Sequence, residues 1–296
     1  MNIFINNDLF VSQKINVYYQ MDYNNFIDLF FYKLSLTNNI NITENINNAT
    51  IQIYGIQTTK NTNIRKDIPC LLICNENCSV GRKHYNHFNE FNYFNDERIN
   101  IYIYNDISNI IIKKNKIAIP FIYLYIDQFI RLEKQIQINN IDFKNKKFCL
   151  FTSRNLHNKN KSRIITFLSK YGEIDYISNY NISNISCFHD VKLLQLYNNY
   201  KFIICFENSI SDGYITEKIF NVFLAKSIPI YNGAPNINNY LNKEAILNIN
   251  NKSSLIKLNK LISNEDLYNN FINLNKININ YNNENWDSLL YDYIKL

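Results

Sequence analysis

The residues that decide the fold read Tyr200-Lys-Phe-Ile-Ile-Cys-Phe206, followed directly by Glu207-Asn208-Ser209. The first part is mostly apolar and rich in residues that favour β-structure, as a strand buried in a parallel sheet requires. It gives way abruptly to three polar residues. In α/β proteins the carboxyl ends of parallel strands face the crevice where ligands bind. We therefore expect these three residues to stand at a ligand-binding edge.

A helix and a second strand follow closely. Gly213 permits a tight turn because it has no Cβ. Thr216-Glu217-Lys218 then opens a helix whose apolar residues recur at helical spacing, at Ile219, Phe220, Phe223 and Leu224. Ser227-Ile-Pro-Ile-Tyr231 has the composition of the next strand, and Gly233-Ala-Pro235 ends it. The stretch predicts a strand, a polar loop, a helix and a strand of an α/β domain.

Lys218 has an unusual place in this pattern. It lies in the first turn of the expected helix, where the positive end of the helix dipole disfavours a cation. A bound anion would remove the conflict, because free backbone N–H groups at a helix start suit a phosphate. The alternative is a surface lysine whose charge is solvated. Lys218 by itself leaves both interpretations open.

The rest of the chain repeats the alternation of strands and helices. In the first half we expect strands at residues 15–19, 50–55, 69–74 and 100–104, and helices at 23–36 and 121–132. In the second half we expect further strands at 148–152, 174–177 and 246–249, and helices at 163–171, 189–197, 253–262, 264–274 and 284–296. Such alternation favours doubly wound α/β domains.

The length of 296 residues suits two domains of roughly 150 residues each. The basic run Lys-Asn-Lys-Lys at residues 144–147 is the expected linker. The predicted organisation is an N-terminal domain of residues 1–143, a second domain of residues 144–278 and a C-terminal helix within residues 279–296.

Composition excludes several classes of protein. Apolar residues make up 46% of the chain and aromatic residues 15%, which indicates a globular protein. The net charge of +6 suits an anionic ligand, but no basic run is long enough to predict nucleic-acid binding. No stretch reaches the ~18 apolar residues of a membrane-spanning helix, and the N-terminus lacks the features of a signal peptide. We therefore expect a cytoplasmic protein.

The spacing of cysteine and histidine does not favour a metal site. Cys70, Cys74 and Cys78 stand four residues apart and are followed by His84 and His87. The paired Cys-x2-Cys spacing typical of zinc sites is missing. We expect that this protein binds no structural metal.

Three segments of the opening stretch resemble a known motif. Phe206-Glu-Asn-Ser209, Tyr214-Ile-Thr-Glu-Lys218 and Ile228-Pro-Ile-Tyr-Asn-Gly233 are similar, in order and spacing, to the donor-binding motif of the α-1,3/4-fucosyltransferases, glycosyltransferase family 10. The soluble bacterial members look most similar. The resemblance implies a GT-B fold, with two Rossmann-like domains facing each other across a cleft. It also implies that residues 1–143 form the acceptor-side domain and residues 144–278 the domain that binds the GDP-sugar donor. The C-terminal helix within residues 279–296 is then expected to pack back on the first domain.

The same resemblance implies an activity. Members of the family transfer L-fucose from GDP-β-L-fucose to a glycan hydroxyl with inversion, here with α-1,3 linkage to GlcNAc or Glc as the expectation. Inversion needs a general base for the acceptor hydroxyl and a positive environment for the departing diphosphate. Asn75-Glu76-Asn77 ends an apolar strand and resembles the family's Gly-Glu-Asn segment, although Asn75 replaces the glycine. We expect Glu76 to be the base; a surface glutamate is the alternative.

Arg163 and Lys218 are the residues expected at the diphosphate. An arginine can hold phosphate oxygens through two parallel hydrogen bonds. Arg163 begins the helix expected after a polar loop, and its surroundings resemble those of the family's donor-site arginine. Arg154 is the rival, because the loop between them differs in length from that of the relatives.

Three further residues are expected in the donor pocket. Glu217 would accept hydrogen bonds from hydroxyls of the fucose or the ribose, and Asn208 and Tyr214 would line the pocket. Each has a structural alternative: Asn208 as a strand-end cap, Tyr214 as core and Glu217 as a carboxylate favoured by the helix dipole. Their occurrence together at the motif spacing favours the functional interpretation. For Glu207 two interpretations stay open: it is either a structural partner of the loop or a residue of the donor site.

Two other functions remain open. The same scaffold would serve a transferase for another nucleotide sugar, or a catalytically silent module that binds nucleotide sugars or glycans. No Asp-x-Asp pair for a metal is present, so we expect no required cofactor, and stimulation by divalent cations would be compatible with this. GDP-fucose and a glycan acceptor are the expected partners. The sequence predicts neither the acceptor nor the oligomeric state.

Overall fold

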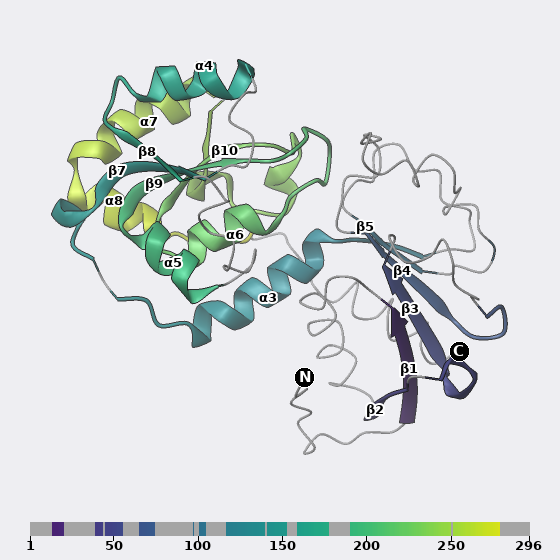
Figure 1. Ribbon diagram of the computed structural model, residues 1–296. Helices are drawn as coiled ribbons and strands as arrows, with labels where there is room; N and C mark the ends of the chain where they lie inside the picture. Colours follow the sequence, from purple (N-terminus) through teal and green to yellow (C-terminus); the bar gives the residue numbers. More distant parts are fainter. Residues whose placement is uncertain are drawn as a thin grey trace. The chain divides into compact units, whose positions relative to one another are not determined.

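The computed structural model describes residues 14–20, 39–43, 45–55, 65–74, 97, 101–104, 117–139, 141–152, 159–177, 190–249 and 251–278. The described residues up to Leu124 belong to one compact unit, and those from Tyr125 onward belong to a second. The division falls within the residues of helix α3 (Ile122–Gln135), between Leu124 and Tyr125 (Figure 1). The expected helices at residues 23–36 and 284–296 lie outside the described residues.

A six-stranded parallel sheet forms the first unit. Its strand order is β2-β1-β3-β4-β5-β6. The strands are β1 (Lys14–Gln20), β2 (Asn39–Ile42), β3 (Ile51–Gly55), β4 (Cys70–Cys74), β5 (Ile101–Tyr104) and β6 (Ile117–Pro120). The wholly apolar β4 lies inside the sheet, and Leu71 and Leu72 are buried. The four strands predicted for this half are confirmed.

The strands that sequence analysis missed, β2 and β6, are the two outer strands in this order. β2 reads Asn-Ile-Asn-Ile, a pattern that recurs throughout this asparagine-rich chain and so carries little signal. β6 ends in Pro120, which cannot donate to a neighbouring strand and is tolerated at a sheet edge. Outer strands need only one partner, so their sequences are less constrained.

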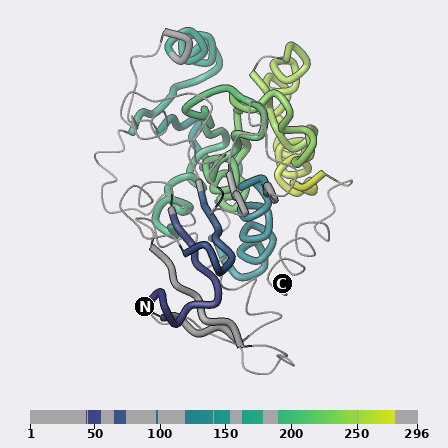
Figure 2. The backbone as a smooth tube through the Cα atoms, turned by 90° about the vertical axis from the view of Figure 1, so that its right-hand side faces the viewer, coloured from purple at the N-terminus to yellow at the C-terminus, as the bar shows by residue number. Residues whose placement is uncertain are grey.

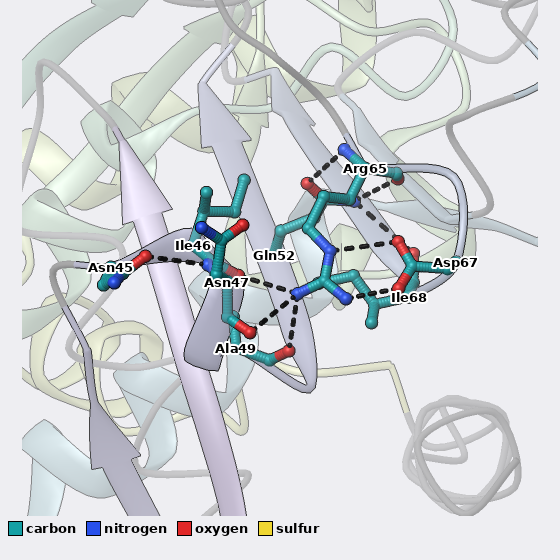
Figure 3. A network of polar contacts seen from close by, with 8 residues as sticks. All are labelled: Asn45, Ile46, Asn47, Ala49, Gln52, Arg65, Asp67 and Ile68. Atoms are coloured by element: carbon teal, nitrogen blue, oxygen red, sulfur yellow. Dashed lines mark hydrogen bonds and ion pairs between the residues drawn. The ribbon is translucent and has the colours of Figure 1, made fainter.

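An arginine ties together the loops beside β3 (Figure 3). Arg65 Nη1 donates to the carbonyl oxygens of Ile46 (2.8 Å), Asn47 (3.2 Å) and Ala49 (3.3 Å) around the short 3-10 helix η2 (Ile46–Asn48). Its Nε and Nη2 pair with Asp67. The buried Gln52 of β3 exchanges two hydrogen bonds with the Arg65 backbone. The planar guanidinium, with five donors, is suited to this convergence of acceptors.

A five-stranded parallel sheet forms the second unit. Its order is β11-β10-β9-β7-β8. The strands are β7 (Lys147–Thr152), β8 (Ile174–Ile177), β9 (Tyr200–Phe206), β10 (Ile228–Asn232) and β11 (Leu247–Asn248). All five were expected from the sequence. β9, the apolar run predicted to be a buried strand, lies at the centre between β7 and β10.

Helices cover both faces of this second sheet (Figure 1). They are α4 (Lys159–Leu168), α5 (Val191–Asn198), α6 (Glu217–Leu224), α7 (Lys252–Ser263) and α8 (Glu265–Ile272), with the 3-10 turns η5 (Phe143–Asn145), η7 (Ile237–Asn239) and η8 (Lys243–Ala245). α5 and α6 pack on one face, and α4, α7 and α8 bury the other face in the main core. α7 and α8 lie side by side (Figure 2).

Two details of the second unit differ from the sequence analysis. Helix α4 begins at Lys159, so Arg163 lies one turn into the helix and does not start it. Residues 159–162, expected in a polar loop, form the first turn of this helix. Residues 144–147 are the expected linker, but Phe143 lies in the core beside them and Lys146 is 7% exposed.

Candidate functional site

The candidate site lies where β9 ends and α6 begins. Backbone pairing continues one residue beyond β9, because Glu207 N donates to the Asn232 carbonyl at 2.9 Å. The chain then turns back through Gly213, whose φ of 76° suits a residue without a Cβ. Its N–H donates to Asn236 Oδ1 at 2.8 Å. The loop thereby delivers the start of α6 to the carboxyl end of the central strand, as predicted.

Glu207 is the centre of the polar network at this position. Its side chain is 0% exposed. Oε1 accepts the Thr216 backbone N–H at 2.8 Å, and Oε2 accepts the Thr216 hydroxyl at 2.8 Å and the Lys218 ammonium at 3.1 Å. A buried carboxylate needs such partners, because an unpaired buried charge is strongly unfavourable. Glu207 therefore fixes the entry into α6 and holds the lysine.

Thr216 is the N-cap residue of α6 but does not use its hydroxyl as a cap. The hydroxyl makes no bond to the helix N–H groups. It donates to Glu207 and accepts from Lys218 Nζ at 2.8 Å. A threonine at this position ordinarily satisfies one of the free N–H groups of the first turn. The side chain instead links the buried carboxylate to the ammonium.

Lys218 presents a firmly held positive charge. Its side chain is 30% exposed, and Nζ lies 3.7 Å from Glu217 Oε1 in addition to its two hydrogen bonds. Burial alone lowers the pKa of Lys218, but the attraction of Glu207 and Glu217 outweighs it, so the pKa lies above its ordinary value. An ammonium has three donors. Two of them make the hydrogen bonds to Glu207 and Thr216, and the side chain remains exposed enough for an acceptor from outside to reach the ammonium.

Glu217 is held by a residue from a distant part of the chain. Tyr125 of α3 donates from its hydroxyl to Glu217 Oε2 at 3.3 Å. The Tyr125 ring is stacked on Phe220 of α6, with 5.8 Å between ring centroids and 23° between planes. Phe129 also contacts Phe220, at 5.8 Å between centroids. α3 is thus fixed against the helix that carries Glu217 and Lys218.

Gly233 gives the buried carboxylate its space. A Cβ placed on Gly233 would lie 2.5 Å from Glu207 Cγ and 2.5 Å from Tyr231 Cζ, both far inside contact distance. Tyr231 is fully buried, and its hydroxyl accepts the Ala234 N–H at 3.0 Å. Only glycine fits at the end of β10 without displacing one of these side chains.

The structure brings some of the residues predicted from sequence together. Glu217 and Lys218 are neighbours in the network, Asn208 is exposed just beyond β9, and Tyr214 is buried at 2% exposure. Arg163 is exposed on α4, and no contact that the structure describes joins it to this network. Glu76 and Arg154 lie outside the described residues.

Sequence analysis missed two contributors and left one undecided. Thr216 was noted only as a helix start, and Tyr125 was not noted at all. Tyr125 stands 92 residues before Glu217, so no local spacing could have indicated the contact. Glu207 was left between two interpretations. The structure shows that it is a buried partner of the loop and of Lys218.

Two other features, a metal centre and a membrane-spanning helix, are absent from the described residues. No group of three His, Cys, Asp or Glu side chains among them could hold a metal ion. Cys78, His84 and His87, which the sequence places near Cys70 and Cys74, lie outside the described ranges. Of the helices that are described, none is both long and apolar enough to cross a membrane.

Two parallel-sheet units with a polar site at the end of a central strand define the class of this protein: it has the GT-B fold of glycosyltransferases. Two solved structures share it over almost their whole length. "Crystal Structure of alpha1,3-Fucosyltransferase with GDP" matches with a TM-score of 0.65 and 14% identity, over 100% of this chain and 94% of that one. "Crystal Structure of alpha1,3-Fucosyltransferase with GDP-fucose" matches with a TM-score of 0.61 and 13% identity, over 96% of this chain and 91% of that one.

Sequence comparison identifies the family. The model "Glycosyltransferase family 10 (fucosyltransferase) C-term" matches residues 141–289, half of the chain, and the protein belongs to glycosyltransferase family 10. GDP-fucose protein O-fucosyltransferase 3 of Xenopus tropicalis is 36% identical over 108 residues, which are 35% of this chain and 23% of that protein. The chain spans about a quarter of the length of the curated relatives it matches first.

Proposed function

We propose that this protein transfers L-fucose from GDP-β-L-fucose to a hydroxyl of a glycan acceptor, with inversion at the anomeric carbon. The observation that carries the proposal is the Lys218 ammonium, held by Glu207 and Thr216 at the carboxyl end of the central strand. The Lys218 side chain is 30% exposed, so an anion can reach the ammonium, and the chain belongs to a fucosyltransferase family. The two similar α1,3-fucosyltransferase crystal structures are complexes with GDP and with GDP-fucose.

Each residue of the donor site has a proposed role. The Lys218 ammonium contacts the diphosphate and stabilises the negative charge that develops as GDP departs. Arg163 provides the second cation, and Arg154 is the alternative. Glu217 accepts hydrogen bonds from sugar hydroxyls, which its 21% exposed side chain permits. Asn208 and Tyr214 contribute to the pocket wall.

The reaction needs one base and forms one bond as another breaks. Glu76 takes the proton of the acceptor hydroxyl while that oxygen attacks the anomeric carbon of fucose from the face opposite GDP. The bond between the anomeric carbon and the β-phosphate oxygen breaks, and GDP leaves with the electron pair. Attack from the opposite face turns the β-linked donor into an α-linked product. We propose the 3-hydroxyl of GlcNAc or Glc as the acceptor group.

In this proposal, side chains of the protein supply the positive charge that stabilises the departing diphosphate. Lys218 and Arg163 take the role that a metal ion has where an Asp-x-Asp pair is present, and the sequence has no such pair. Transfer should therefore continue in EDTA. A complete and reversible loss of transfer on chelation would overturn this part of the proposal.

Calorimetric titration tests the donor site. We expect the wild type to bind GDP-fucose and GDP-mannose but not UDP-galactose. Lys218→Ala should weaken GDP-fucose binding about 10- to 100-fold, the worth of one charge-assisted hydrogen bond. Lys260→Ala, which removes an exposed lysine of α7, is the matched control and should bind like the wild type. Binding of UDP-galactose in preference to both GDP-sugars would refute the proposal.

A second variant separates binding from chemistry. Glu76→Gln should bind GDP-fucose with unchanged affinity and lose transfer, because an amide cannot take up the proton. If Glu76→Gln transfers fucose at the wild-type rate, Glu76 is not the base.

A further inference from the structure

The contacts of Glu217 suggest a function for a residue outside the motif. Each carboxylate oxygen of Glu217 faces a different neighbour: Oε1 lies 3.7 Å from Lys218 Nζ, and Oε2 accepts the Tyr125 hydroxyl at 3.3 Å. A carboxylate has about four lone-pair sites. Two neighbours therefore fix its plane and still leave positions for hydroxyls of a ligand.

Tyr125 is held rigidly enough to act as such a support. It is 1% exposed, and its ring packs on Phe220, which lies one turn after Glu217 on α6. Phe129, one turn later on α3, contacts both Phe220 and Phe223, with centroids 5.8 and 5.9 Å apart. The two helices therefore meet along a row of aromatic rings, and the tyrosine hydroxyl stands at the end of this row nearest the site.

The hydroxyl itself is not needed for this packing. A phenylalanine would give the same stacking, and a buried hydroxyl costs free energy unless it has a partner. Burial and the neighbouring carboxylates Glu217 and Glu207 raise the pKa of Tyr125, so the group stays protonated and can donate at neutral pH. Its described acceptor in the site is Glu217.

We propose that Tyr125 is a positioning residue that orients the Glu217 carboxylate toward the hydroxyls of the bound nucleotide sugar. The inference rests on the proposed function, because it assumes that Glu217 contacts the donor. It extends the site to a helix that no motif includes. Without the tyrosine hydroxyl, Glu217 can rotate toward water or toward Lys218, and its hydrogen bonds to the sugar become weaker.

Tyr125→Phe is the direct test, because it removes one oxygen and keeps the ring. Tyr268→Phe is the matched control. Tyr268 is also 1% exposed in the second unit, but its hydroxyl donates to the carbonyls of Lys201 and Lys226 and not to the site. For both variants and for Glu217→Gln, calorimetry gives the affinities for GDP-fucose and for GDP, and thermal unfolding gives the unfolding temperature.

We expect Tyr125→Phe to weaken GDP-fucose binding about three- to tenfold, as the loss of an orienting hydrogen bond implies. If Glu217 faces the fucose, the affinity for GDP should fall less than the affinity for GDP-fucose. If Glu217 faces the ribose, both affinities should fall equally. Both patterns support the proposal. Tyr268→Phe should lower the unfolding temperature at most, with unchanged affinities. A merely structural role of Tyr125 would give that same pattern.

Two results separate the failure of this inference from that of the proposed function. If Glu217→Gln weakens GDP-fucose binding and Tyr125→Phe does not, Tyr125 does not position Glu217 and the inference falls while the function stands. If the wild type binds no GDP-sugar, the proposed function fails first and the inference falls with it.

Discussion

The most informative perturbation of this structure is Glu207→Gln. Glutamine has almost the same shape as glutamate, so the space beside Gly233 remains filled. Its amide oxygen can still accept the Thr216 N–H that Oε1 accepts at 2.8 Å. Its NH2 group, however, takes the place of Oε2, which accepts the Thr216 hydroxyl at 2.8 Å and the Lys218 ammonium at 3.1 Å.

The magnitude follows from what each partner can do afterwards. The Thr216 hydroxyl can rotate and accept, because a hydroxyl both donates and accepts. The Lys218 ammonium cannot, and it loses a hydrogen bond between charged groups worth about 1.5–3 kcal/mol. Breaking a fully buried ion pair costs about 3–5 kcal/mol. Because the Lys218 side chain is 30% exposed, water replaces part of the loss. We expect the free energy of unfolding to fall by about 2–3 kcal/mol.

Urea unfolding at pH 7 measures this loss, with Glu244→Gln as the matched control. Glu244 also pairs with one lysine, with 3.0 Å between Oε2 and Lys257 Nζ, but its side chain is 60% exposed. Such surface pairs contribute about 0–1 kcal/mol. The reasoning is refuted if the two variants lose the same small amount, since burial would then have no effect. The Glu207 variant should also bind GDP-fucose more weakly, because Lys218 is no longer held.

Two further predictions follow from the geometry. Gly233→Ala should lower the free energy of unfolding by about 1–3 kcal/mol, because its Cβ would lie 2.5 Å from Glu207 Cγ and from Tyr231 Cζ; an unchanged melting temperature would contradict this. Lys276 is 6% exposed and donates to the carbonyls of Ile272 (2.7 Å) and Leu274 (2.8 Å) at the end of α8. Burial lowers its pKa from 10.5 to about 8, so the unfolded state binds more protons between these values and stability rises with pH across that window. Relative to Lys276→Met, the wild type should gain up to roughly 3 kcal/mol from pH 8 to 10.5; parallel curves for the two proteins would contradict the assignment.

The strand–loop–helix–strand unit could be predicted because its signals are local. β9 and β10 are continuous apolar runs, and the apolar face of α6 recurs at helical spacing. The same reasoning placed β4 inside its sheet. It failed for β2 and β6, whose sequences are short and alternate with asparagine or end in proline. It also began α4 one turn late, because residues 159–162 are all polar and offer no apolar spacing from which the start of a helix could be placed.

The site shows a similar limit. Glu217 and Lys218 were predictable because consecutive residues at a helix start are close in any fold. The burial of Glu207 was not, since a glutamate after a strand is equally compatible with exposure. The contact of Tyr125 with Glu217 depends on how α3 packs against α6. Helix packing of that kind is set by the whole fold and leaves no spacing in the sequence.

The measurement that tests the central claim most directly is transfer followed by NMR of the product. Purified protein is mixed with GDP-β-L-fucose and an acceptor that carries GlcNAc or Glc, and both GDP release and the anomeric configuration of the new linkage are followed. We predict GDP release that depends on the acceptor and a product with α-linked fucose. A β-linked product would contradict the inverting mechanism, and absence of transfer by protein that binds GDP-fucose would contradict the assignment as a transferase.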